Sequence, residues 1–209
     1  MRTRIKFCGC TSPEDALAAV EAGVDAIGMI FADSPRRISP QTARAIAREL
    51  PPFVTPVGVF VFPTRAEVER AREAVPNLLL QLSGNESPEQ AAVLGASIKA
   101  IHVRAEGEPL DELRRRTDEY STMMPLFDTQ VDGRAGGTGV PFAWRALEGL
   151  ARERPIVVAG GLTAANVGGC IRIVRPYAVD VRSGIETDGH KDRAKMRAFV
   201  TAVRERDET

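Results

Sequence analysis

Several shortages in this 209-residue sequence exclude whole classes of protein. Basic and acidic residues balance at 28 each, so the formal net charge is zero and a general nucleic-acid or anionic-membrane surface is not expected. No apolar run approaches the ~18 residues of a membrane span, and the start of the chain lacks the pattern of a signal peptide. We therefore expect a cytoplasmic protein with neither a membrane nor a nucleic acid as its partner.

Cysteine and histidine are also scarce, with three and two residues. An odd cysteine count disfavours a disulfide framework. Cys8 and Cys10 form a C-x-C pair, whereas redox pairs more often read C-x-x-C, and His102 and His190 lack the spacing that would complete a metal site. We predict no metal and no cofactor. Cys8 is then either a single reactive thiol or a small buried hydrophobe.

One pattern repeats along the whole chain, in which a short apolar run of β type precedes a helical segment. The runs are mostly continuous in apolarity, which is typical of parallel strands that are covered on both faces. The predicted strands are Arg4–Cys8, Asp25–Phe31, Thr55–Val61, Leu78–Leu82, Ile98–Val103, Met123–Phe127, Pro155–Ala159 and Ala178–Val181.

The segments between these runs carry helix signals. Thr11 or Ser12, Ser39 and Thr163 stand where N-caps are expected, and glycine or proline follows several helix ends. The predicted helices are Pro13–Ala22, Pro40–Leu50, Thr64–Val75, Glu86–Gly95, Leu110–Thr117, Phe142–Ala151, Ala164–Val174 and Asp192–Arg206.

Eight strand–helix units fit either an open doubly wound sheet or a closed barrel. Eight is the number of parallel strands that closes around an interior filled by side chains. We therefore favour a compact α/β fold of the (βα)8 TIM-barrel type. No low-complexity linker divides the chain, so the prediction is a single domain over residues 1–209.

Active sites of such barrels lie at the carboxyl ends of the strands. Glycine-rich turns follow strands six, seven and eight, at 136–139 (GGTG), 159–161 (AGG) and 182–184 (RSG). Glycine lets backbone N–H groups approach an anion closely, and this end of the barrel is a usual phosphate site. Each cluster alone could simply make a turn, but the three together favour a phosphate ligand.

Four side chains at the same strand ends could carry chemistry. Cys8 ends the first strand, and Asp128 follows an apolar strand whose burial would raise its pKa, so thiol and carboxyl could form an acid–base pair. Arg36 could bind a carboxylate in a bidentate manner. Asp180 ends the last strand. The residues alone leave simpler roles open: a loop cap for Asp128, a loop-fastening bond for Asp180 and a solvated charge for Arg36.

These stretches together resemble the phosphoribosylanthranilate isomerase family of tryptophan biosynthesis. The family opening K-[IV]-C-G-[IL]-T…E-D-A is here KFCGCTSPEDA. The resemblance continues through GMIFADSPRRIS, VGVFV, LLLQLSG, FDT, GGTGVPFAW, VAGGLTAANV and AVDVRSGIE…GHKD, in order and over nearly the whole chain.

The resemblance implies an Amadori rearrangement of N-(5-phosphoribosyl)anthranilate to 1-(2-carboxyphenylamino)-1-deoxyribulose 5-phosphate, without a cofactor. It makes Cys8 the general base and Asp128 the general acid. Asp180 would stabilise the cationic nitrogen, and Arg36 would hold the anthranilate carboxylate. The backbone amides assigned to the phosphate are those of Gly137, Gly160, Gly161, Ser183 and Gly184. Both monomers and homodimers fit the family.

Four departures and three rival functions accompany this interpretation. Ser83 stands where the family usually has histidine, Ala143 where aspartate is common, Arg182 where a small residue is usual, and Cys10 where an aliphatic residue is usual. A sugar isomerase of histidine biosynthesis, or one that serves both pathways, would use aspartate in place of Cys8. Indole-glycerol phosphate synthase needs a lysine acid, for which Lys6 is the nearest candidate. The third rival is a phosphosugar-binding barrel without activity.

Overall fold

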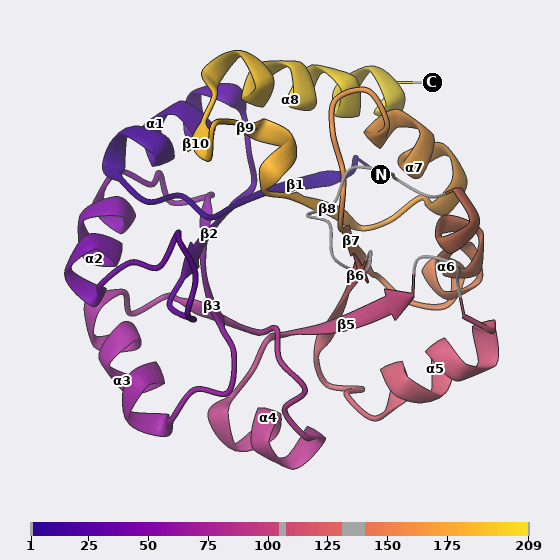
Figure 1. Cartoon of the computed structure of the whole chain (residues 1–209), viewed down its shortest axis with the longest axis horizontal. Coiled ribbons are helices and arrows are strands. Elements are labelled where there is room, and N and C mark those ends of the chain that lie inside the picture. The colour runs from indigo at the N-terminus through magenta and orange to yellow at the C-terminus, as the bar shows by residue number, and fades with distance from the viewer. Residues whose placement is uncertain (1, 105–107, 131–140, 209) are drawn as a thin grey trace.

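The computed structural model describes residues 2–104, 108–130 and 141–208. Eight parallel strands pair in sequence order, and the last pairs with the first, so the sheet is a closed barrel (Figure 1). This confirms the predicted (βα)8 barrel and excludes the alternative of an open doubly wound sheet. The strands are β1 (Arg4–Cys8), β2 (Ala26–Ile30), β3 (Thr55–Phe60), β4 (Leu79–Leu82), β5 (Ile98–Arg104), β6 (Met124–Gln130), β7 (Val157–Ala159) and β8 (Ala178–Val181).

A helix follows each strand and packs on the outside of the ring (Figure 1). Serine caps act as predicted, since Ser12 Oγ accepts from the Asp15 amide and Ser39 Oγ from the Thr42 amide. The helices are α1 (Pro13–Ala22), α2 (Pro40–Arg48), α3 (Arg65–Ala74), α4 (Pro88–Leu94), α5 (Leu110–Asp118), α6 (Pro141–Glu153), α7 (Val167–Val174) and α8 (Arg193–Asp207).

Two predicted helix starts are wrong because side chains hold the backbone in turns there. Helix α4 begins at Pro88, not Glu86, since the Glu86 carboxylate instead accepts from the amides of Phe62 and Gly84. Helix α7 begins at Val167, not Ala164. The Asn166 side chain accepts from the Thr163 amide and donates to the Gly161 carbonyl, so Thr163 does not cap the helix.

The sequence patterns missed one small structure between β8 and α8. Residues Ser183–Ile185 form a short 3-10 turn (η1), and β9 (Glu186–Thr187) pairs antiparallel with β10 (His190–Lys191). Asp188 and Gly189 make the hairpin turn at φ of 51° and 82°. Strands of two residues lie below the length at which hydrophobic alternation becomes visible.

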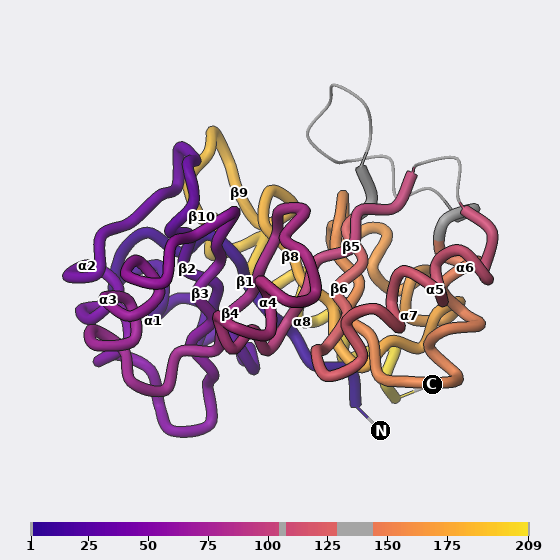
Figure 2. The backbone as a smooth tube through the Cα atoms, turned by 90° about the horizontal axis from the view of Figure 1, so that it is seen from below, coloured from indigo at the N-terminus to yellow at the C-terminus, as the bar shows by residue number. Residues whose placement is uncertain are grey.

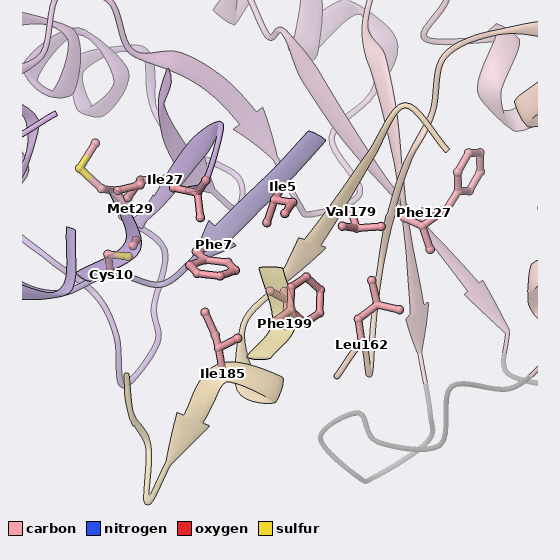
Figure 3. Close-up of a cluster of buried hydrophobic side chains, with 14 of the residues drawn as sticks. Ile5, Phe7, Cys10, Ile27, Met29, Phe127, Leu162, Val179, Ile185 and Phe199 are labelled. Atoms are coloured by element: carbon pink, nitrogen blue, oxygen red, sulfur yellow. The ribbon is translucent and has the colours of Figure 1, made fainter. Parts of the chain in front are cut away.

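The main core lies between the strands and the helices. Phe7 of β1 meets Phe199 of α8 edge to face, with ring centroids 6.0 Å apart (Figure 3). Both side chains are fully buried, as is Cys10 nearby. A separate cluster fills the inside of the barrel, and its members are Ala100, Leu126, Val157, Ala159 and Ala178. Small and branched side chains thereby fill the barrel interior beneath the polar groups at its carboxyl end.

The strands run from the end of the barrel where both chain ends lie toward the opposite end (Figure 2). Asp207 fastens the two ends together, because its carboxylate accepts from the amide and the hydroxyl of Thr3 at 2.9 and 2.7 Å. Across the described ranges, no helix combines the length and apolarity that a membrane crossing requires.

We expect Phe199→Ala to lower the free energy of unfolding by about 3–5 kcal/mol, because it opens a cavity beside Phe7. Val93→Ala is the control, since Val93 on α4 is 73% exposed and its truncation should change stability by no more than ~0.5 kcal/mol. Urea unfolding of both variants measures the difference. Equal losses in the two variants would contradict this placement of the core.

Candidate active site

A cavity of about 520 Å³ opens at the carboxyl ends of the strands. It brings together most of the residues that the sequence predicted. The predicted residues that line it are Cys8, Arg36, Asp128, Gly160, Gly161, Asp180 and Ser183. Gly184 lies in the adjoining turn, while Gly137 falls outside the described residues. The seven lining residues come from three strands and three loops, which therefore share one chamber.

Lys6 and Asp180 form a buried ion pair inside the barrel. They are register partners on β1 and β8, and Lys6 Nζ donates to Asp180 Oδ2 at 2.8 Å. Both side chains are at most 7% exposed. Burial opposes the charged ammonium, but Asp180 and Cys8 together raise the pKa of Lys6 above its usual value. The other oxygen, Asp180 Oδ1, is buried and has no hydrogen-bond partner among the described residues.

Glycine on the neighbouring strand makes room for the ammonium and the thiol to meet. Gly28 is the register partner of Cys8. A Cβ atom at Gly28 would lie 2.8 Å from Cys8 Sγ and 3.1 Å from Lys6 Nζ, so any larger residue would push them away. Burial raises the pKa of the Cys8 thiol, while Lys6 is the first among the cations that lower it. The protein thus keeps a fixed positive charge beside a buried thiol.

Asp128 lies inside β6 and is paired in register with His102 of β5. Burial raises the pKa of Asp128, and His102, when charged, opposes this rise. His102 Nε2 carries a hydrogen, because its 3.0 Å partner is the carbonyl oxygen of Ser83, which can only accept. A partly buried carboxyl with a raised pKa is suited to hold a proton and deliver it.

Arg36 is not a solvated loop charge. Its Nε and Nη2 donate to the two carboxylate oxygens of Glu186 at 2.9 and 2.5 Å. Glu186 also accepts from Lys191 Nζ at 2.8 Å, and Lys191 donates to the Cys8 carbonyl at 2.6 Å. The two cations keep the pKa of Glu186 below its usual value although burial acts to raise it. Arg36 is therefore held at the mouth by an internal carboxylate.

The turns after β7 and β8 pack backbone against backbone. Gly160 and Gly161 adopt φ of 83° and 62°, a region that glycine enters without strain. A Cβ at Gly184 would lie 2.0 Å from the carbonyl oxygen of Leu162, so only glycine fits there. Among the described residues, no acceptor pairs with the N–H groups of Gly160 and Gly161. Such amides are available to an anion in the cavity.

The structure adds polar residues that sequence reasoning did not select. Gln81 is 4% exposed in the cavity wall, with Nε2 donating to Ser83 Oγ at 3.1 Å and Oε1 without a partner in the described chain. His102, Glu186 and Lys191 act beside Asp128 and Arg36 as described above. Alternation could have selected Gln81 and His102, because both occupy inward positions of predicted strands. Glu186 and Lys191 fall within the stretch AVDVRSGIE…GHKD that carries the resemblance, but no local pattern assigns either of them a role.

Comparison with known proteins decides between the enzymes that share this arrangement. The model of the family N-(5'-phosphoribosyl)anthranilate (PRA) isomerase matches residues 5–202. The chain belongs to the PRA isomerase family. Enzymes of that name from Nitrosococcus oceani and Pseudomonas putida GB-1 are 47% and 48% identical to it over 206 residues. In both cases the match covers 97% of this chain and 98% of the relative.

Solved PRA isomerase structures share the fold of this member. The structure of the Thermotoga maritima protein has a TM-score of 0.87 at 36% identity and covers 97% of this chain and 99% of that one. Another has a TM-score of 0.82 at 35% identity, with the same coverage, and contains reduced 1-(o-carboxyphenylamino)-1-deoxyribulose 5-phosphate. A thiamine phosphate pyrophosphorylase from Pyrococcus furiosus, at 14% identity and a TM-score of 0.65, shares the fold alone.

We expect Lys6→Met to raise the pKa of Cys8, because the ammonium is the strongest of the groups that lower it. The pH dependence of Cys8 alkylation by iodoacetamide, followed by peptide mass spectrometry, should then move to higher pH. Cys10 and Cys170 serve as unreactive internal references, since burial raises the pKa of each to about 12. Arg182→Met is the matched control, because Arg182 lowers the Cys8 pKa less. Equal shifts in both variants would contradict the role of Lys6.

Proposed function

We propose that the chain isomerises N-(5-phosphoribosyl)anthranilate with Cys8 as general base and Asp128 as general acid. The observation that carries this proposal is their convergence, with Asp180, on one cavity between an arginine and two glycine turns. The substrate is a small phosphoribosyl compound. We further propose a cytoplasmic enzyme that acts as a monomer or a homodimer.

The first step opens the sugar ring. Asp128 donates its proton to the ring oxygen, the C1–O bond breaks, and the nitrogen lone pair forms a C1=N bond that carries a positive charge. Burial favours the protonated carboxyl that this step needs, because it raises the pKa of Asp128. The developing cation would lie near Asp180, whose Oδ1 lacks a partner among the described residues and can accept from the substrate N–H.

The second step removes the C2 proton. Cys8 takes that proton, the C–H electrons form a C1=C2 double bond, and the nitrogen becomes neutral. The resulting enolamine gains a proton at C1 and loses its hydroxyl proton to give the ketone. The thiol must ionise first, although burial raises its pKa. The cationic substrate nitrogen would supplement Lys6 and favour the thiolate at the moment when the base is needed.

Binding groups at the two ends of the cavity fit the two anionic ends of the substrate. The amides of Gly160, Gly161, Ser183 and Gly184 would hold the phosphate, and Arg36 would hold the anthranilate carboxylate. The ribose would then lie between them, over Cys8 and Asp128. Arg182, at the phosphate turn, lines the same cavity and would add positive charge.

The rival functions fit the site less well. An isomerase of histidine biosynthesis would present aspartate at the end of β1, where this chain has Cys8. Lys6 is a poor candidate for the lysine acid of indole-glycerol phosphate synthase, because Asp180 holds it in an ion pair. The presence of both Cys8 and Asp128 in the cavity weighs against an inactive phosphosugar binder, which would need neither group.

We expect Cys8→Ala and Asp128→Asn each to lower kcat by about 10²–10⁴-fold, the usual contribution of a general acid or base. Fluorescence-monitored conversion of freshly made phosphoribosylanthranilate measures this loss. Binding of the reduced product analogue should survive in both variants. Cys10→Ala is the matched control, since Cys10 packs in the outer core and should leave kcat unchanged. Losses confined to KM would contradict both roles, and an inactive wild type would favour the binder.

We expect inorganic phosphate to stabilise the protein through the turns after β7 and β8. Preferential binding adds RT ln(1 + [L]/Kd) to stability, which is about 2.7 kcal/mol at one hundred times Kd. Thermal unfolding in millimolar phosphate should show a rising midpoint, with sodium chloride at equal ionic strength as the control. A midpoint that does not differ between the two salts would argue against the phosphate site.

A further inference from the structure

We propose that Glu186 and Lys191 of the β9–β10 hairpin are positioning residues that make the site selective for an aryl carboxylate. They bind one edge of the Arg36 guanidinium, so that its other edge faces the ligand. The inference rests on the proposed role of Arg36 and adds how that role is built. Nothing in the sequence motifs assigns a function to this hairpin.

The geometry leaves Arg36 able to bind a second carboxylate. A guanidinium carries five N–H donors. Glu186 uses one on Nε and one on Nη2, at 2.9 and 2.5 Å, which occupies the side edge of the group. Three N–H donors have no acceptor among the described residues, two on Nη1 and one on Nη2. One from each of these nitrogens forms the end edge, which matches a carboxylate in bidentate fashion.

The charges around Arg36 explain why Lys191 is needed. Glu186 alone would neutralise Arg36 and repel an incoming carboxylate. Lys191 Nζ lies 2.8 Å from Glu186 Oε1, and both side chains are at most 5% exposed. Two cations and one carboxylate leave one net positive charge, which a ligand carboxylate can then neutralise. Glu186 and Lys191 are shielded from water and the Arg36 side chain is 20% exposed, so this balance acts more strongly on a ligand than it would in bulk water.

The same hairpin ties carboxylate recognition to the strand that carries Cys8. Lys191 donates to the Cys8 carbonyl at 2.6 Å. The Arg36 side chain crosses over Gly9, where a Cβ atom would lie 3.0 Å from Arg36 Cδ. Gly9 has a φ of 76°, which further favours glycine. These contacts fix the position of the Arg36 side chain relative to β1. They therefore also fix the distance between a carboxylate bound to Arg36 and the Cys8 thiol.

The test compares two ligands that differ in one group: the reduced product analogue with its carboxyl and the same compound built on aniline. Calorimetry gives Kd of each for wild type, Arg36→Met, Glu186→Gln, Lys191→Met and the Glu186→Gln/Lys191→Met double variant. Glu153→Gln is the matched control, because Glu153 makes the same bidentate contact with Arg114 on the outer helices. Arg37→Met is the control for Arg36→Met, since Arg37 does not line the cavity.

We expect Glu186→Gln to weaken the carboxylated ligand by on the order of tenfold, with the aniline compound unchanged. KM should rise while kcat stays within a few-fold. If Glu186 and Lys191 acted through their charges alone, the opposite would be expected. Glu186→Gln would bind the carboxylated ligand more tightly, and the double variant would recover the wild-type affinity. Either result would overturn the positioning role, as would equal losses for both ligands. The double variant should instead remain weak.

The comparison separates this inference from the proposed function. If Arg36→Met binds both ligands as wild type does, the role of Arg36 fails and the hairpin's role fails with it. If Arg36→Met loses the carboxylate preference but Glu186→Gln and Lys191→Met keep it, only the positioning role is wrong. Stabilisation of each variant by inorganic phosphate to the wild-type extent shows that the fold is retained. Should Glu186→Gln fail to fold, Lys191→Met decides, since its weakened binding must also be specific to the carboxylate.

Discussion

The buried ion pair between Lys6 and Asp180 is the interaction on which the rest of the site depends. It joins β1 to β8, the seam at which the barrel closes, and places a fixed cation in the interior. Desolvating two charges costs several kcal/mol per ion, which only close contact and further bonding can offset. The ion pair therefore need not stabilise the fold, but it fixes the electrostatic field at the Cys8 thiol. Gly28 completes the constraint by leaving room for thiol and ammonium side by side.

The sequence predicted the barrel and most of the site because both follow from local patterns. Apolar runs identify the strands. In a parallel barrel the residues that follow the strands all lie at its carboxyl end, so the sequence could predict that Cys8, Asp128 and the glycine turns share that end. Contacts that cross the chain could not be predicted in this way. The Asn166 side chain bonds to the preceding turn, so α7 begins later than predicted. Glu186 binds Arg36, which lies 150 residues away in the sequence. Such side-chain hydrogen bonds leave no periodic signal in the sequence.

The glycines divide into those that need a special φ and those that need space, and sequence alone does not separate them. Gly160 and Gly161 have positive φ, whereas Gly184 is required by the carbonyl oxygen of Leu162 only 2.0 Å from its would-be Cβ. That contact joins the turn after β7 to the turn after β8. The two halves of the proposed phosphate site therefore pack backbone against backbone, and a side chain at Gly184 would separate them.

Three polar residues in the cavity are each half satisfied. Asp180 gives one oxygen to Lys6 and Gln81 gives its amide nitrogen to Ser83, while Asp180 Oδ1 and Gln81 Oε1 are buried without a partner in the described chain. Arg36, which is partly exposed, gives one edge to Glu186. A buried polar atom left unpaired costs about 1–3 kcal/mol. The bonded half fixes the orientation, and the open half would face a bound ligand. A ligand whose polar groups pair with the open halves would offset that cost without reordering the site, so binding would favour one geometry.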